Sequence, residues 1–191
     1  YYNHGPRLHE YLEEFHRDVF SHHDCMVLAE APMITPKKAL EYIDEGNAPV
    51  LDMMIQFATQ EADCLFMDFN HIPFNLRKLK RAYSNWQNGL EGKGWNMLYI
   101  ENHDHPRMVS RYGSEKFRTE SAKMLAVSYL FLKGTPFIYQ GQEIGMSNWY
   151  PEDPEMYEDV QTRWQYFNVG TKRSPEKRLQ RLEVVAAERG P

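Results

Sequence analysis

Two groups of charged and polar residues follow directly after apolar stretches of this 191-residue chain. The first is Glu30, which comes after the uncharged residues 25–29. The second is Glu101-Asn102-His103-Asp104, which comes after residues 97–100. Polar groups in such places are costly to bury unless they face a polar cavity or bond to one another. A carboxyl group beside apolar surroundings is also suited to act as a general acid. Both groups are therefore candidate parts of a site that moves protons.

Two carboxylates, Glu30 and Asp104, could together support the hydrolysis of a glycosidic bond. One carboxylic acid protonates the leaving oxygen, and carboxylates stabilise the cationic centre that develops on the sugar. Other readings fit the same residue types: Glu30 could cap a helix or join an ion pair. His103 could be a metal ligand, a base, a donor to a substrate hydroxyl, or a core histidine bound to a backbone carbonyl. Metal binding is disfavoured because no second His stands at helical spacing with an acidic partner. We therefore expect no metal and no cofactor.

Charge and composition exclude several classes of partner. The net charge of -5 provides no basic field for nucleic acid or for an anionic membrane surface. No apolar run reaches the roughly 18 residues of a membrane span, and no signal peptide is visible, so a cytoplasmic protein is expected. Cys25 begins an apolar run and is expected to be a buried free thiol.

Hydrophobic periodicity predicts the elements that position these groups. Four short apolar runs, at residues 26–29, 51–57, 95–100 and 136–139, are typical of buried strands. Apolar residues at helical spacing predict helices over 8–19, from 35 onward, over 76–90 and over 122–129. Thr35 and Asn75 are expected as N-caps, and Lys133-Gly134 as the end of the last of these helices. Residues 150–191 predict a loop excursion followed by an amphipathic helix near 176–187.

The alternation of helix and strand predicts an α/β fold with parallel strands joined by right-handed crossovers. Two architectures fit this order, an open doubly wound sheet and part of a (β/α)8 barrel. In both, ligands bind at the carboxyl ends of the strands, where Glu30 and residues 101–104 stand. No Gly-rich phosphate loop follows any strand, which disfavours nucleotide binding.

Three motifs, in order and at matching spacing, resemble conserved segments of the α-amylase superfamily of glycoside hydrolases (glycoside hydrolase family 13). Residues 102–107 (NHDHPR) resemble its fourth conserved region, and residues 27–32 (VLAEAP) resemble its third, at the end of barrel strand five. Residues 134–146 (GTPFIYQGQEIGM) resemble the strand-eight segment of the oligo-1,6-glucosidase and α-glucosidase branch. Residues 2–6 and 95–96 fit that branch too, so the resemblance covers nearly the whole chain.

The resemblance implies a role for each candidate residue. Glu30 would be the general acid/base, Asp104 would stabilise the transition state by gripping sugar hydroxyls, and His103 would bond the same ring. Further substrate-binding positions implied by the motif are Asn102, His105 and Arg107. His105 stands where the branch often has Gln, at a position that the resemblance places at the pocket mouth and connects with substrate specificity. Glu101 receives no role beyond anchoring the loop.

The implied reaction is the retaining hydrolysis of α-glucosidic bonds in short gluco-oligosaccharides of the isomaltose or maltose type, in carbohydrate metabolism. It would proceed through a covalent glycosyl-enzyme intermediate. Trehalose-6-phosphate hydrolase and sucrose isomerase, both of the same branch, are alternative functions. A non-catalytic barrel module is an alternative from a different class.

The family's nucleophile, an Asp at the end of strand four with an Arg two residues before it, has no counterpart upstream of Glu30. The chain is therefore expected to be the C-terminal half of a (β/α)8 TIM barrel, from about helix four to strand eight. Residues 1–149 would form the barrel half, and residues 150–191 the loop and helix after strand eight. The expected partners are an oligosaccharide substrate and the N-terminal half of the barrel, and the isolated chain is expected to lack activity.

Overall fold

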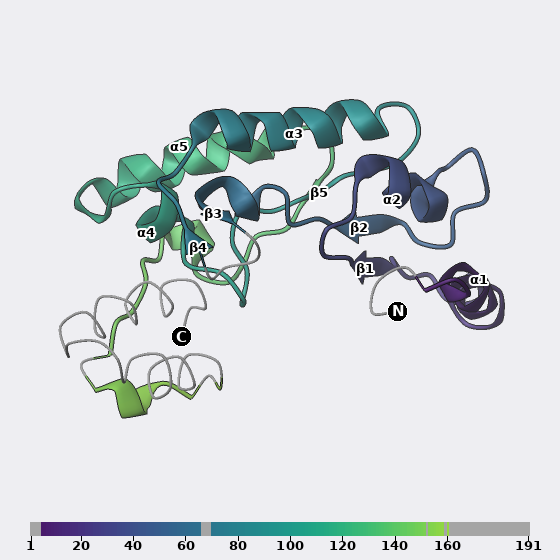
Figure 1. Ribbon diagram of the computed structural model, residues 1–191, viewed down its shortest axis with the longest axis horizontal. Helices are drawn as coiled ribbons and strands as arrows, with labels where there is room; N and C mark the ends of the chain where they lie inside the picture. Colours follow the sequence, from purple (N-terminus) through teal and green to yellow (C-terminus); the bar gives the residue numbers. More distant parts are fainter. Residues whose placement is uncertain (1–4, 66–69, 152, 159, 161–191) are drawn as a thin grey trace. The chain divides into compact units, whose positions relative to one another are not determined.

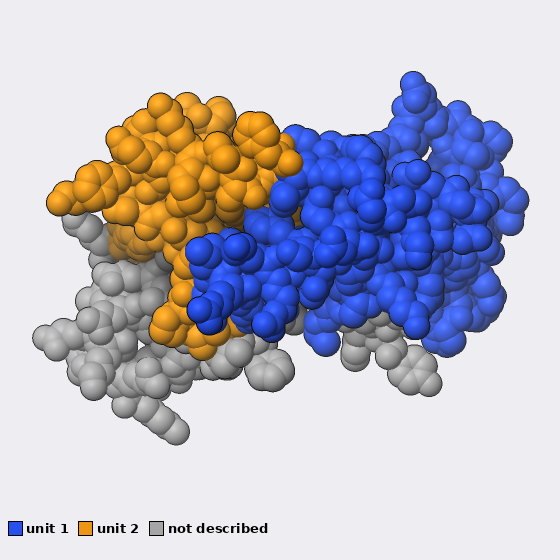
Figure 2. Space-filling view, turned by 90° about the horizontal axis from the view of Figure 1, so that it is seen from above, with its two compact units in different colours: residues 1–63, 75–98, 132–137 blue, residues 64–74, 99–131, 138–191 orange. Residues whose placement is uncertain are grey.

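The computed structural model describes residues 5–65, 70–151, 153–158 and 160, which fall into two compact units (Figure 2). Unit 1 comprises residues 1–63, 75–98 and 132–137, and unit 2 comprises residues 64–74, 99–131 and 138–191. Because each unit combines three separate stretches of chain, residues distant in sequence meet within it.

Unit 1 contains two pairs of parallel strands. β1 (Leu28–Glu30) pairs with β2 (Met53–Ile55), which places Glu30 opposite Ile55. β5 (Met97–Leu98) pairs with β6 (Thr135–Pro136), and β2 also lies against β5. The helices of this unit are α1 (Leu8–Asp18), α2 (Pro36–Ile43) and α3 (Leu76–Leu90), with the short 3₁₀ helices η1 (Phe20–His22) and η2 (Gln60–Asp63). The parallel pairing confirms the strand–helix–strand order that the periodicity predicts.

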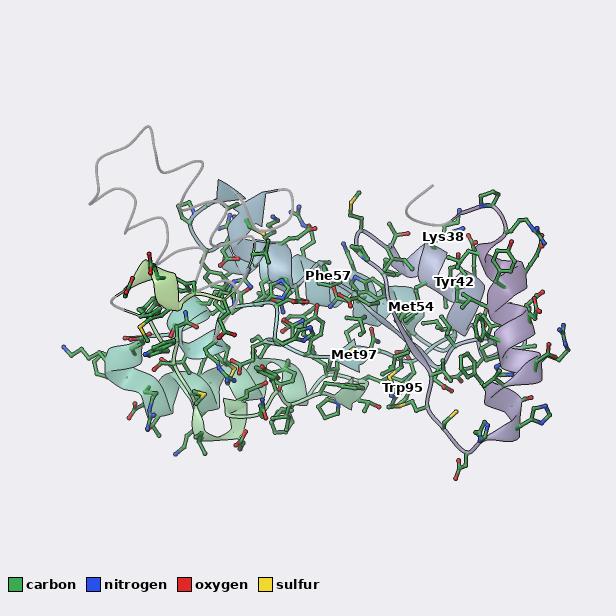
Figure 3. The ribbon with its side chains drawn as sticks, turned by 90° about the horizontal axis from the view of Figure 1, so that it is seen from below. Lys38, Tyr42, Met54, Phe57, Trp95 and Met97 are labelled. Carbon is green, nitrogen blue, oxygen red and sulfur yellow. The ribbon has the colours of Figure 1, made fainter. Side chains whose placement is uncertain are left out.

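Helix caps and an apolar core hold unit 1 together. Thr35 accepts a hydrogen bond from the backbone N–H of Lys38 at 3.3 Å, and Asn75 accepts one from Lys78 at 3.1 Å, so both predicted N-caps are confirmed. α2 and α3 pack together on the same side of β1 and β2 (Figure 1). Tyr42 of α2 and Met54 of β2 (Figure 3) belong to one buried cluster. Its other members are Ile34, Ala39, Ile43, Val50, Leu51, Trp86 and Leu90.

Unit 2 is mainly helical. α4 (Met108–Tyr112) lies against α5 (Arg118–Leu130). The short 3₁₀ helices are η3 (Glu115–Phe117), η4 (Gln142–Ile144) and η5 (Pro154–Met156), and β3 (Cys64–Leu65) forms an antiparallel pair with β4 (Asn70–His71). Buried apolar side chains of this unit include Tyr99, Ile100, Met108, Val109, Leu125 and Tyr129. Among the helices of the described residues, none has the length and apolar character that crossing a membrane requires.

Several sequence expectations need correction. Each strand is shorter than its apolar run, because a strand extends only as far as a neighbour supplies hydrogen bonds. The antiparallel pair of β3 and β4 was not expected. The thiol of Cys25 is exposed rather than buried. The helix expected near residues 176–187 lies outside the described residues.

The expectation that Gly134 ends the preceding helix is wrong. α5 ends at Leu130, four residues earlier. Gly134 has φ 150°, and a Cβ atom there would lie 2.4 Å from the backbone oxygen of Asn96. The glycine is therefore required by the close approach of the chain to Asn96, where the Thr135 N–H bonds the same oxygen at 2.9 Å.

Candidate functional site

Glu30 lies at the carboxyl end of β1 with its side chain exposed. The backbone pairing with β2 continues one residue further, since the Ala31 N–H donates to the Ile55 oxygen at 3.3 Å. A tight turn follows, closed by the Ile34 N–H on the Ala31 oxygen at 3.4 Å, with Met33 in the left-handed region at φ 62°. The strand thus presents the Glu30 carboxylate to solvent, without the apolar cover that the sequence suggested.

The Asn102 side chain makes hydrogen bonds within the loop between β5 and α4. Its side-chain oxygen accepts the N–H of Asp104 at 3.1 Å and lies 2.7 Å from Nδ1 of His105. The backbone oxygen of Asn102 also accepts the His105 N–H at 3.4 Å. His105 is buried, with 3% of its surface exposed. These contacts between the Asn102 and His105 side chains and the neighbouring backbone therefore fix the conformation of the loop.

His103 and Asp104 point outward from the same loop. Their side chains are 71% and 54% exposed, and Nε2 of His103 lies 3.4 Å from a carboxylate oxygen of Asp104. The backbone N–H of Asp104 is held by Asn102, so the carboxylate is exposed on a locally fixed backbone. A carboxylate beside an imidazole, both open to solvent, can bind the hydroxyl groups of a polar ligand.

Glu101 and Arg107 form a buried ion pair at the base of this loop. Nη1 of Arg107 donates to Oε1 of Glu101 at 2.9 Å, and the side chains are 7% and 0% exposed respectively. The other carboxylate oxygen accepts the N–H of Met108, the first residue of α4, at 2.6 Å. Glu101 thus anchors the loop at both of its ends. Sequence reasoning did not predict Arg107 as the partner of Glu101. The available signal was an arginine six residues after a glutamate that directly follows an apolar run.

Arg107 also contacts the segment that follows β6. Its Nη1 donates to the backbone oxygen of Gln140 at 2.7 Å, and the guanidinium lies 4.7 Å from the centre of the Tyr139 ring. The backbone N–H of Arg107 donates to the side-chain oxygen of Asn148 at 2.8 Å. The guanidinium that the resemblance assigns to a substrate pocket is therefore engaged inside unit 2.

The stability of the chain should depend on pH through Glu101. Burial raises the pKa of Glu101 above its ordinary 4.5, and the charge of Glu143 adds to the rise, while hydrogen bonds from Met108 and Arg107 oppose it. In the folded state this carboxyl keeps its proton to a higher pH than in the unfolded state. The folded state therefore gains stability from the protonated form of Glu101. This contribution to the free energy of unfolding is complete below pH 4.5 and is lost as the pH rises through the raised folded pKa.

The measurement is thermal unfolding of the wild-type chain and of Glu101→Gln over a pH series that begins below 4.5. The melting temperature of wild type is expected to fall relative to that of Glu101→Gln as the pH rises. Glu91→Gln makes the same chemical change at an exposed side chain and provides the baseline. A wild-type advantage that grows with pH would contradict the expected sign.

The predicted site residues are divided between the two units. The loop of unit 2 brings together Asn102, His103, Asp104, His105 and Arg107, whereas Glu30 belongs to unit 1. Across residues 5–65, 70–151, 153–158 and 160, no three His, Cys, Asp or Glu side chains are grouped so that they could hold a metal ion. Unit 1 thus presents the exposed carboxylate of Glu30, and the loop of unit 2 presents the exposed carboxylate of Asp104 beside His103.

Comparison with known proteins gives consistent matches. The model of the α-amylase catalytic domain matches residues 1–179. The chain is 46% identical over 164 residues to the oligo-1,6-glucosidase of Parageobacillus thermoglucosidasius, covering 85% of this chain and 29% of that protein. It is 42% identical over 165 residues to the trehalose-6-phosphate hydrolase of Bacillus subtilis, covering 85% of this chain and 29% of that protein.

A solved structure supports the same relationship. The crystal structure of trehalose-6-phosphate hydrolase from Bacillus licheniformis matches with a TM-score of 0.86 and 39% identity. That match covers 96% of this chain and 33% of the other. The chain thus spans about a third of the length of the proteins that it resembles.

Proposed function

This chain belongs to the family of α-amylase catalytic domains, a family of (β/α)8 barrels, and on that premise we propose that it forms part of a retaining glycoside hydrolase that cleaves α-glucosidic bonds. The proposed substrates are short gluco-oligosaccharides of the isomaltose or maltose type. The observation that carries the proposal is the agreement of the family match with two exposed carboxylates, Glu30 at a strand end and Asp104 in the loop after β5.

Glu30 is the proposed general acid and base. In the first step its proton goes to the glycosidic oxygen as the bond from C1 to that oxygen breaks, and a carboxylate outside this chain forms a bond to C1. In the second step Glu30 takes a proton from water as the water oxygen attacks C1 and the enzyme carboxylate leaves. The exposure of the Glu30 side chain supports this role, since an acid must reach both a substrate oxygen and water.

We propose that Asp104 stabilises the cationic sugar and that His103 forms a hydrogen bond to the same sugar ring. Both side chains are exposed on a backbone that Asn102 holds in place, which supports a binding role for the pair. Asn102 and His105 contact each other inside the loop, and His105 is buried, so we assign both residues to supporting this geometry rather than to contacting the substrate.

We propose that the chain supplies the second half of the barrel, with residues 1–149 as that half and residues 150–191 as the excursion after strand eight. The two parallel strand pairs of unit 1 and the helices between their strands support this arrangement. An Asp nucleophile would come from the first half, which would be the partner of this chain in the complete site. The isolated chain should therefore show no turnover of p-nitrophenyl α-glucoside.

A composite enzyme tests the proposed function. In it, the matched segment of the oligo-1,6-glucosidase of Parageobacillus thermoglucosidasius is replaced by the corresponding residues of this chain. Release of glucose from isomaltose and of p-nitrophenol from p-nitrophenyl α-glucoside is expected from the composite enzyme and not from the isolated chain. A folded composite that releases neither product would refute the proposal and favour a non-catalytic barrel module.

The matches to trehalose-6-phosphate hydrolases support trehalose 6-phosphate as an alternative substrate. A second composite, built on the Bacillus subtilis trehalose-6-phosphate hydrolase, separates the two readings. The composite whose kcat/KM lies nearer to that of its own parent identifies the substrate that this chain fits. Product analysis with sucrose covers the remaining alternative, sucrose isomerisation.

A further inference from the structure

The loop that carries His103 and Asp104 is closed at its base by a buried charge pair. Glu101, with its side chain 0% exposed, uses one oxygen for Arg107 and the other for the N–H of Met108. The residues on either side of the loop are thereby tied to one carboxylate. The five residues between them have little freedom to move without breaking a bond to a buried charge.

The segment after β6 is shaped around the same arginine. Gln140 accepts a hydrogen bond from Arg107, and the Tyr139 ring packs against the guanidinium. Gly141 has φ 89°, and a Cβ atom at this position would lie 3.3 Å from both terminal nitrogens of Arg107 and 2.8 Å from the sulfur of Met146. Asn148 accepts the backbone N–H of Arg107 at 2.8 Å. Two loops of unit 2 therefore meet on one guanidinium.

We propose that Glu101 and Arg107 form a clasp that positions His103 and Asp104 for reaction, and that Arg107 acts through the clasp rather than by touching the substrate. This differs from the pocket-lining role that the family resemblance implies for Arg107. The polar contacts of its guanidinium within unit 2 go to Glu101 and Gln140, one face lies near the Tyr139 ring, and the side chain is 7% exposed. The catalytic part of the proposal rests on the proposed function, whereas the structural part does not.

The structural part is tested on the 191-residue chain by amide hydrogen exchange. Glu101→Gln retains the shape of the side chain but turns a donor group toward Arg107 or Met108, so one of the two bonds is lost. The amides of residues 104, 105, 107 and 108 (residue 106 is a proline and has none) are expected to exchange at least about tenfold faster than in wild type, while those of α3 in unit 1 stay unchanged. Glu91→Gln, at an exposed ion pair with Lys133, is the matched control and should change neither region. Unchanged exchange in residues 104–108 of Glu101→Gln would overturn the clasp.

The catalytic part is tested by a double-mutant cycle in the composite enzyme with isomaltose. Glu101→Gln and Arg107→Met should each lower kcat about tenfold to a hundredfold, with KM changed less than about threefold, because a small displacement of reacting groups is costly. The double variant is expected to be no slower than the slower single variant, since both changes open the same clasp. Multiplied effects would show that the two residues act independently of each other, and an effect confined to KM would indicate that Arg107 contacts the substrate. Either outcome would overturn the positioning role.

The conservative variant Arg107→Lys distinguishes loss of the clasp from a general loss of folding. Within the described part of the chain, one nitrogen of the guanidinium, Nη1, makes the hydrogen bonds to Glu101 and to Gln140, so a single ammonium group can replace it. This variant is expected to recover most of kcat and of the protection of residues 104–108. Recovery of protection without recovery of kcat would mean that the clasp exists but does not position the reacting groups. If the composite enzyme itself is inactive, the proposed function fails while the exchange experiment still decides whether the clasp exists.

Discussion

Replacement of Glu30 by Gln is expected to lower kcat/KM of the composite enzyme for isomaltose by about 10²- to 10⁴-fold, the range typical of losing a general acid. The amide has nearly the same shape as the acid but has no proton to give to the glycosidic oxygen. Because Glu30 is exposed at the end of β1, the melting temperature should hardly change. Glu45→Gln, at an exposed glutamate of the same unit, is the matched control and should retain full activity.

The dependence on leaving group gives this prediction its specificity. p-Nitrophenolate leaves without protonation, so Glu30→Gln should slow the first step much less with p-nitrophenyl α-glucoside than with isomaltose. Azide needs no general base to attack the intermediate, so it should restore turnover and yield α-glucosyl azide, with retained configuration. Equal losses on both substrates, with no azide product, would remove Glu30 from the acid/base role.

Replacement of Asp104 by Asn is expected to lower kcat/KM for isomaltose by about 10²- to 10³-fold, as removal of one preorganised group that stabilises a developing charge typically does. The loop itself should be undisturbed, because Asn102 holds the backbone N–H of Asp104 and not its carboxylate. A carboxylate that is 54% exposed also contributes little to folding, so the melting temperature should be close to wild type.

The contact that Asp104 makes can be identified with p-nitrophenyl α-glucosides that each lack one ring hydroxyl. If the carboxylate binds a given hydroxyl, the penalty for Asp104→Asn should shrink when that hydroxyl is absent, because the lost interaction is the same one. Asp153→Asn, at an exposed aspartate of unit 2, provides the control. A penalty that is the same for every deoxy substrate would contradict direct binding of a ring hydroxyl by Asp104.

Local chemistry accounts for what could be predicted about the elements. Thr35 and Asn75 cap helices because their short side chains accept the unpaired N–H groups of a first helical turn, which needs only neighbouring residues. The alternation of strand and helix also indicated parallel strands, as β1 with β2 and β5 with β6 confirm. The ends of the strands were predicted less well, because they depend on where a distant partner stops.

Contacts between distant segments account for what sequence reasoning missed. Gly134 resembled a helix end but is required by its approach to Asn96, 38 residues earlier in numbering, which no local pattern reveals. Glu101 appeared to be a minor anchor, yet it is among the most buried polar side chains of unit 2. Its importance becomes visible only when the loops after β5 and β6 are placed together on Arg107.

The sequence by itself determined the family of this chain, the alternating order of its elements, and the identity of the polar residues after each strand, because motif and periodicity are written in adjacent residues. The tertiary structure decided how those polar residues are used. It left the His103 and Asp104 side chains open to solvent and drew Arg107 inward to Glu101. The physical reason is that a buried charge must find a partner, and which side chain is buried depends on how distant segments pack.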